Sequence, residues 1–193
     1  MTIQISGSSE QHPEVATAEI RVRGGQGMKN MVPPPHAVDS GVGILEDLER
    51  RLDEYRDLLL RSLDGLTEVE AATPLIAGRP SLLGVVRHTG FVQGVWLCEA
   101  VTGRTRQEIG IPVSTANSWK TRRTDTIRSV LAERRRIDEL ARLHIRGRGP
   151  ESVVTGRGPR TVRSLLTHVL SELAWNTGQS DILRAAILAR RRG

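Results

Sequence analysis

The 193-residue sequence contains a single cysteine, few aromatic residues and no long apolar run. Because Cys98 has no second cysteine to pair with, an intramolecular disulfide is excluded. Cys98 lies in the apolar segment VQGVWLCEAV, which predicts a small buried hydrophobe rather than a reactive thiol. No segment approaches the roughly 18 apolar residues of a membrane span, and the N-terminus lacks the apolar core of a signal peptide. The sequence therefore predicts a cytoplasmic protein without a membrane partner.

Lysine is also scarce, so arginine supplies nearly all of the positive charge. Lys29 and Lys120 are the only lysines among 28 basic residues, and the net charge is +6. Nucleic-acid sites combine such charge with aromatic stacking residues or a recognisable docking motif. Aromatic residues make up only 3% of this chain, and no such motif is present. The arginine clusters predict a solvated basic surface and argue against a nucleic-acid partner.

Composition divides the chain into a leader and one domain. Residues 1–38 are polar and rich in Ser, Gly and Pro, which predicts a disordered leader. Residues 39–193 are long enough to bury a sizeable core, so we expect a single domain there.

Four segments have the apolar spacing of helices, and Thr67, Ser81 and Thr161 are predicted to cap the starts of helices. Segments 41–64 and 125–143 carry charge opposite their apolar positions and are expected to pack on one side. Segments 82–102 and 161–192 are apolar nearly all round and are expected at the centre. The pattern predicts an all-α fold, a four-helix bundle with long connections.

The two longest connections have different expected roles. Residues 103–123 are longer than most structureless loops in a compact domain, which indicates a lid or a crossover. Residues 144–160 contain the tetrapeptide GRGP twice, which is too short for a structural repeat and predicts a flexible or hairpin-like loop.

One polar stripe runs along the last predicted helix. Taken as a helix, the chain places four polar side chains on one face among apolar neighbours, namely His168, Glu172, Asn176 and Gln179. Such groups need partners, which hydrogen bonds, a ligand or a metal could supply. Bundles build sites from facing helices, and His88 lies midway along the 82–102 segment. We therefore expect His88 and Glu172 to be catalytic and Asn176 and Gln179 to contact a cofactor.

The sequences SLLGVVRH in segment 82–102 and LLTHVLSELAWNTGQSDILRAAI in the last segment resemble the DinB-like superfamily. They resemble in particular its actinobacterial branch of mini-circle proteins, which are related to mycothiol-dependent transferases, and the resemblance covers about residues 33–188. The resemblance implies an up-up-down-down bundle that binds zinc or nickel through one histidine on the second helix and a Glu-x-x-x-His pair on the last. It also implies a thiol cofactor, mycothiol or bacillithiol, and a small-molecule substrate.

Within this resemblance, the metal ligands are only partly present. His88 matches the first ligand and Glu172 the second. Asn176 stands where the family has its ligand histidine, and Gln179 where the branch often has another. A neutral amide is a poor ligand for zinc or nickel, so we expect a weakened or lost metal site.

Three arrangements of this site are open. In the first, the metal is lost and the polar stripe binds a small molecule or partner. In the second, His168 joins His88 and Glu172 around a metal with one open position for water or thiolate. In the third, His88, Glu172 and Asn176 form an acid–base site without metal. For His168 alone, a core histidine bonded to a neighbouring helix is the simpler interpretation.

Two classes of function follow. An enzyme would be a thiol-dependent S-transferase or isomerase acting on a small electrophile, with an open cavity that reaches His88 and Glu172. The alternative is a non-catalytic binding or stress-response module, conceivably a homodimeric scaffold, in which Trp96 and Trp175 would plug the cavity.

Overall fold

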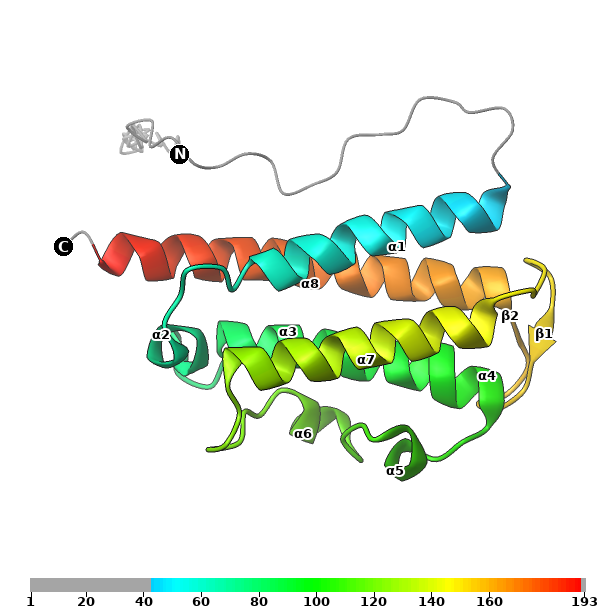
Figure 1. Ribbon diagram of the computed structural model, residues 1–193, viewed down its shortest axis with the longest axis horizontal. Helices are drawn as coiled ribbons and strands as arrows, with labels where there is room; N and C mark the ends of the chain where they lie inside the picture. The colour runs from blue at the N-terminus through cyan, green and yellow to red at the C-terminus, as the bar shows by residue number, and fades with distance from the viewer. Residues whose placement is uncertain (1–42, 192–193) are drawn as a thin grey trace, which may run out of the picture.

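Four long helices form the body of the molecule in the computed structural model, which describes residues 43–191 (Figure 1). They are α1 (Ile44–Arg61), α3 (Leu82–Gln93) with its continuation, α7 (Ile127–Ile145) and α8 (Val162–Arg190). The predicted all-α bundle with long connections is confirmed. The predicted leader, residues 1–38, lies outside the described residues.

Helices α3 and α7 run parallel to each other, and α1 and α8 run the opposite way (Figure 1). Two contacts fix this register: Arg134 donates to Thr89 at 3.0 Å, and Gln93 donates to Asp138 at 2.8 Å. The partners are separated by the same 45 residues in both pairs, and such a constant separation is expected only of parallel helices. The chain order is up-down-down-up, in place of the up-up-down-down order that the resemblance implied. A parallel pair obliges the chain to cross back along the bundle between α3 and α7.

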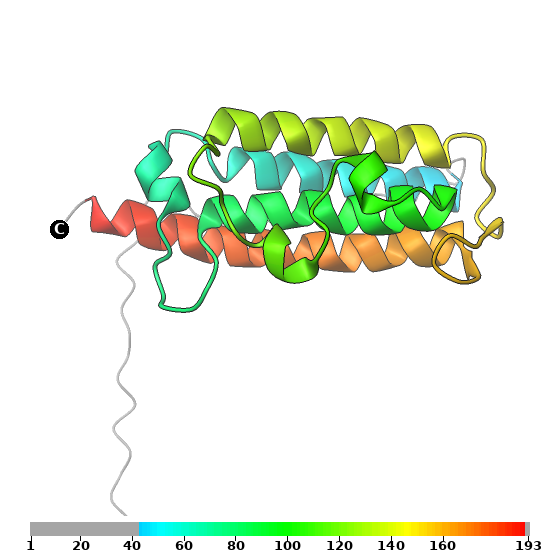
Figure 2. The same ribbon diagram turned by 90° about the horizontal axis from the view of Figure 1, so that it is seen from below.

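Residues 103–126 make this crossing. Of the two roles expected for the long connection, a lid or a crossover, it is a crossover. Figure 2 shows it running along the outside of the bundle and carrying two short helices, α5 (Arg106–Ile109) and α6 (Thr115–Ser118). Each begins with a side-chain cap: Thr105 accepts from the Glu108 amide, and Ser114 from the Asn117 amide, both at 3.2 Å. These caps give local structure to a segment without apolar periodicity.

Three caps predicted from the sequence are present. Thr67 and Glu70 form a reciprocal capping box at the start of α2 (Glu68–Ala72). Ser81 accepts from the Gly84 amide at 3.2 Å and opens α3. Thr161 opens α8 in the same way. The connections on either side of the bundle therefore begin and end where the sequence indicated.

The predicted 82–102 helix is continuous but not α-helical throughout. After α3 it widens into a π-helical turn, η1 (Gly94–Glu99), before finishing as α4 (Ala100–Thr102). Ile111 of the crossover packs closely here, because a Cβ added to Gly94 would lie 2.8 Å from its Cγ2. Because this helix is apolar on nearly all sides, the spacing of its apolar residues does not reveal the π-helical turn.

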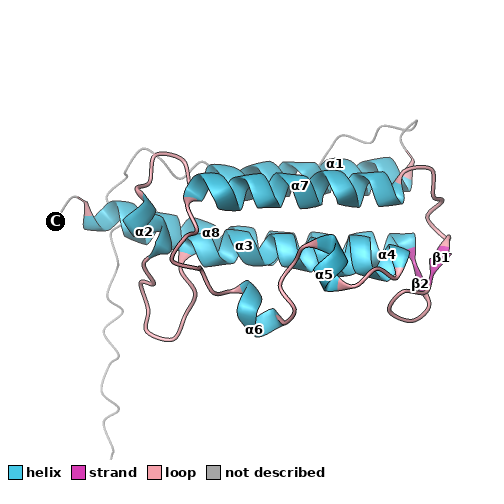
Figure 3. Ribbon diagram, turned by 60° about the horizontal axis from the view of Figure 1, so that its bottom comes forward, coloured by secondary structure: helices cyan, strands magenta, loops and turns pink. Residues whose placement is uncertain are grey.

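The predicted loop 144–160 folds into a hairpin in which β1 (Val153–Val154) pairs antiparallel with β2 (Arg160–Thr161) (Figure 3). Its two GRGP copies differ in structure. Gly147, which begins the first copy, has a φ of +78° and open space around its Cα. Gly156, which begins the second, donates to the carbonyl of Ala100 at 3.0 Å. A Cβ on Gly156 would lie 2.4 Å from the Glu99 carbonyl oxygen, so glycine is required there for close packing.

A charged network is buried inside the bundle. Arg56 and Arg134, which are 3% and 1% exposed, both approach the carboxylate of Asp138. Gln93 accepts from Arg56 at 2.9 Å and donates to Asp138. Burial lowers the pKa of both arginines. Two guanidinium groups therefore depend on one buried carboxylate.

Cys98 lies in the apolar core with no exposed surface, as predicted. Burial raises the pKa of its thiol to about 11, so it is protonated at neutral pH and is not a nucleophile. None of the helices within residues 43–191 has the length and hydropathy needed to cross a membrane.

Candidate functional site

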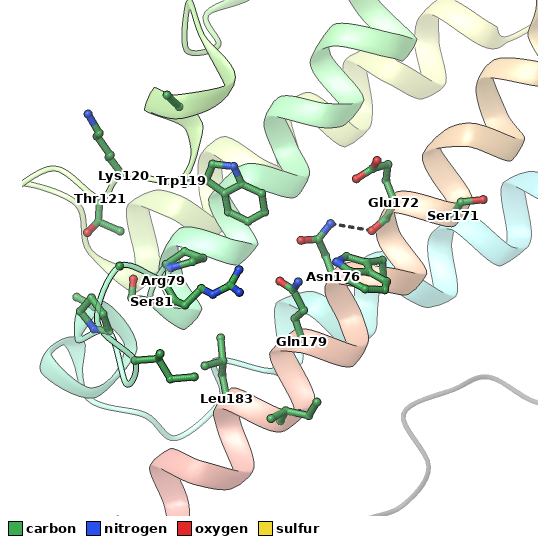
Figure 4. A pocket seen from close by; sticks show the side chains of 18 residues that line it. Arg79, Ser81, Trp119, Lys120, Thr121, Ser171, Glu172, Asn176, Gln179 and Leu183 are labelled. Carbon is green, nitrogen blue, oxygen red and sulfur yellow. Dashed lines mark hydrogen bonds between the residues drawn. The ribbon is translucent and has the colours of Figure 1, made fainter.

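Three segments far apart in the sequence enclose one open pocket of about 1330 Å³ (Figure 4). They are the connection between α2 and α3, the end of α6 with the residues after it, and the middle of α8. Glu172, Asn176 and Gln179 line it from α8, so three members of the predicted polar stripe share one pocket.

His168 does not belong to this pocket. It is exposed, and its ring meets the edge of Trp96 with centroids 4.9 Å apart. The interpretation of His168 as a core histidine is therefore wrong. The stripe extends one turn beyond the pocket, whose α8 wall begins at Ser171.

Asn176 carries an unsatisfied acceptor. Its side-chain nitrogen donates to the carbonyl of Glu172 at 2.8 Å, while its Oδ1 is buried and has no hydrogen-bond partner among the described residues (Figure 4). An unpaired buried acceptor costs about 1–3 kcal/mol. A ligand with an N–H or O–H group would remove that cost.

His88 is 4% exposed and held in one tautomer. Its Nδ1 lies 2.7 Å from the hydroxyl of Ser118, which donates its own proton to the carbonyl of Thr115 at 2.6 Å. The Ser118 oxygen must therefore accept, so Nδ1 carries the proton and Nε2 has the lone pair. Burial lowers the pKa of His88 to about 4, so the ring is neutral at physiological pH.

Trp119 covers His88. The two rings stack with centroids 3.4 Å apart and planes 13° apart, and Trp119, not His88, lines the pocket. Arg87 donates to the carbonyls of Asn117 and Lys120, at 2.9 and 2.6 Å, and so fixes the backbone on both sides of this indole. The cavity reaches Glu172 but stops at Trp119 before His88.

Neither of the tryptophans expected to plug a scaffold fills the pocket. Trp175 is 69% exposed at its rim. Trp96 lies elsewhere, beside His168 and under Arg157 and Arg160. The open cavity favours ligand binding over a filled scaffold.

A family model described as mycothiol-S-transferase matches residues 47–189, which span all four long helices. The chain belongs to the mycothiol-S-transferase family. This confirms the DinB-like, mycothiol-transferase-like resemblance. No curated protein matches the chain.

The donor set of this mycothiol-S-transferase family member does not fit the zinc or nickel centre that the resemblance implies. Within residues 43–191, no three His, Cys, Asp or Glu side chains come together to hold a metal ion. Asn176, which the resemblance aligns with the family's ligand histidine, lines the pocket, and its amide nitrogen donates to the carbonyl of Glu172. The residues present therefore do not form a site for that metal.

Sequence reasoning missed two residues of the pocket. Trp119 is 31 residues from His88, in a segment without apolar periodicity, so the sequence pattern does not predict their contact. Arg79 belongs to a Gly-Arg-Pro turn, where an arginine is expected to be an ordinary surface residue. In Figure 4 its guanidinium points across the pocket toward Asn176 and Gln179. It forms no ion pair or side-chain hydrogen bond with the described part of the chain.

Proposed function

We propose that this protein joins a low-molecular-weight thiol, mycothiol or a related molecule, through its sulfur to a small electrophile bound in the same pocket. Membership of the mycothiol-S-transferase family supports the thiol, and the open pocket supports a small-molecule substrate. The observation that carries the proposal is Arg79, a cation without an ion pair in the described structure. It faces Asn176, where the family's ligand histidine is replaced.

Arg79 supplies the positive charge that a thiolate needs. A free thiol has a pKa near about 8.5, so only a few per cent is thiolate at neutral pH. A guanidinium beside the sulfur stabilises the anion, and lowering the thiol pKa by about one unit makes about ten times more thiolate available. The proton passes to water. His88, with a pKa of about 4 and an indole over its ring, is not its acceptor.

The chemical step needs no oxidant or reductant. The thiolate lone pair forms a carbon–sulfur bond, and the leaving group departs with its bonding electron pair. Asn176 Oδ1 accepts a hydrogen bond from an N–H or O–H group of the thiol molecule, which satisfies its buried lone pairs. Glu172 and Gln179, on the same wall, orient the rest of that molecule.

The test is the rate of thioether formation from mycothiol and an alkyl halide, measured with wild-type protein, Arg79→Gln and Arg128→Gln. Arg128 is exposed on α7 and does not line this pocket, so it is the matched control. We expect Arg79→Gln to lower kcat/KM about tenfold near neutral pH, with the loss shrinking as the pH approaches the thiol pKa. Arg128→Gln should be unchanged.

Two results would overturn the proposal. One is a rate of thioether formation that is the same with the protein as without it. If the protein still binds the thiol in that case, it is a binding module. The other is a rate that disappears after exhaustive chelation and returns with zinc or nickel, which would assign the thiolate to a metal.

A further inference from the structure

We infer that the pocket contains a second subsite that selects an uncharged aromatic or alkyl electrophile. This inference rests on the proposed function, because it names the class of acceptor that the thiol would attack.

Exposed large apolar side chains are concentrated around this pocket. Eight of them are exposed in the described structure, and three, Ile76, Trp175 and Ile182, line the pocket with exposed fractions of 60%, 69% and 72%. Single exposed apolar residues are ordinary on a protein surface. Three around one concavity indicate a binding site for an apolar group.

These side chains come from two segments that line the pocket. Trp175 and Ile182 are seven residues apart on α8 and therefore share a face of the helix, while Ile76 comes from the connection that faces α8 across the pocket. Leu183 and Pro74 continue the same lining. We call this set, Pro74, Ile76, Trp175, Ile182 and Leu183, the apolar wall.

Polar and apolar side chains adjoin each other on the α8 side of the lining, where Gln179 lies between Trp175 and Ile182. Arg79, Asn176 and Gln179 point toward one another in Figure 4 and form the thiol side of the pocket. The apolar wall itself contains no charged residue. An electrophile with a carboxylate or ammonium group placed against this wall would lose hydration without gaining a partner. An uncharged ring can instead lie against the indole face of Trp175.

The size of the pocket allows two occupants. Its volume of about 1330 Å³ exceeds the roughly 300–1,000 Å³ of pockets that hold one drug-sized ligand. The thiol molecule and the acceptor can therefore bind side by side, as a direct transfer requires.

The experiment compares 4-nitrobenzyl chloride with 4-(chloromethyl)benzoate, which share a leaving group and differ in charge. The variants are Trp175→Ser and Ile182→Ser, with Leu143→Ser as control, because Leu143 is 60% exposed on α7 and does not line the pocket. All three side chains are exposed, so the fold is expected to survive. We expect wild-type kcat/KM, relative to the uncatalysed rate, to favour the neutral chloride at least about tenfold. Trp175→Ser should raise KM for that chloride about tenfold and leave kcat nearly unchanged.

Binding of the unreactive analogue 4-nitrotoluene, followed by quenching of tryptophan fluorescence without any thiol, separates this inference from the proposed function. A dissociation constant that rises about tenfold in Ile182→Ser, which keeps Trp175 as reporter, but not in Leu143→Ser supports the subsite even if no thiol transfer is detected. Transfer that proceeds equally with both chlorides and in every variant overturns the subsite while the proposed function stands. Sedimentation that shows a dimer dissociated by Trp175→Ser would also overturn it, because the wall would then bind a second copy of the chain.

Discussion

The indole of Trp119 lies nearly parallel to the imidazole of His88, with ring centroids 3.4 Å apart. The histidine belongs to α3 and the indole to the end of α6, so this contact attaches the crossover to the bundle beside the pocket. It also separates His88, which matches the family's first ligand, from the cavity that holds Glu172 and Asn176. The residues that the sequence predicted as one site are thereby divided into a covered histidine and an open polar wall.

The position of Trp119 against α3 depends on Gly84. A Cβ at this position would lie 2.4 Å from the Trp119 carbonyl oxygen, so Gly84→Ala must push the crossover away from α3. We expect a loss of about 1–3 kcal/mol in the free energy of unfolding, measured by urea denaturation. Gly178→Ala is the control: Gly178 lies within α8 with nothing within 4 Å of its Cβ position. That variant should gain about 0.5–1 kcal/mol from helix propensity. Equal stability of Gly84→Ala and wild type would show that the crossover backbone moves without cost.

His88 makes stability depend on pH. Its native pKa is about 4, whereas a histidine in an unfolded chain titrates near about 6.5. Between these values the unfolded chain binds the proton and the native protein does not. The contribution of His88 is therefore fully present above pH 6.5 or so and is lost as the pH falls toward 4. We expect wild type to lose about 1–3 kcal/mol more than His88→Gln between about pH 7 and pH 4, by denaturant titration. Parallel stability curves for the two proteins would contradict the burial of this ring.

Asp138 is the counter-charge for the buried arginines Arg56 and Arg134. Asp138→Asn leaves both guanidinium groups without a full negative charge in the core, and we expect it to cost about 3–5 kcal/mol. Asp53→Asn removes a carboxylate whose side chain is 47% exposed and which also pairs with Arg56, and it should cost less than about 1 kcal/mol. The two melting temperatures test the difference. Similar losses in both variants would mean that burial does not set the strength of these ion pairs.

Asn176 is expected to limit the metal affinity of the pocket. Asn176→His restores the family's imidazole one turn after Glu172, and we expect the affinity for zinc or nickel to rise at least about tenfold. Metal titration followed by calorimetry measures it. The same substitution combined with Glu172→Gln should lose most of the gain. An unchanged affinity would show that residue 176 does not lie at the family's ligand position.

The sequence predicted the helices and their caps because these depend on neighbours within four residues. Thr67, Ser81 and Thr161 are examples: each cap acts on an amide three residues ahead. The shared pocket of Glu172, Asn176 and Gln179 followed for the same reason, since helical spacing alone aligns them. His168 fits that spacing too, but the pocket wall ends before it.

What the sequence could not predict depends on contacts between distant segments. The parallel course of α3 and α7 rests on pairs 45 residues apart, such as Gln93 with Asp138. Trp119 reaches His88 from a crossover whose path has no periodic signal, and Arg79 faces Asn176 only after two connections have folded against α8. Local patterns do not encode such approaches.

The two GRGP copies set different limits on engineering this protein. In the second copy, the Gly156 backbone packs against the carbonyls of Glu99 and Ala100, so a peptide tag inserted there would pull the hairpin off the end of the bundle. In the first copy, a Cβ added to Gly147 would have nothing within 4 Å. The start of the first copy is therefore the better place to insert a fluorophore tag or to open the chain for circular permutation, at the end of the bundle away from the pocket.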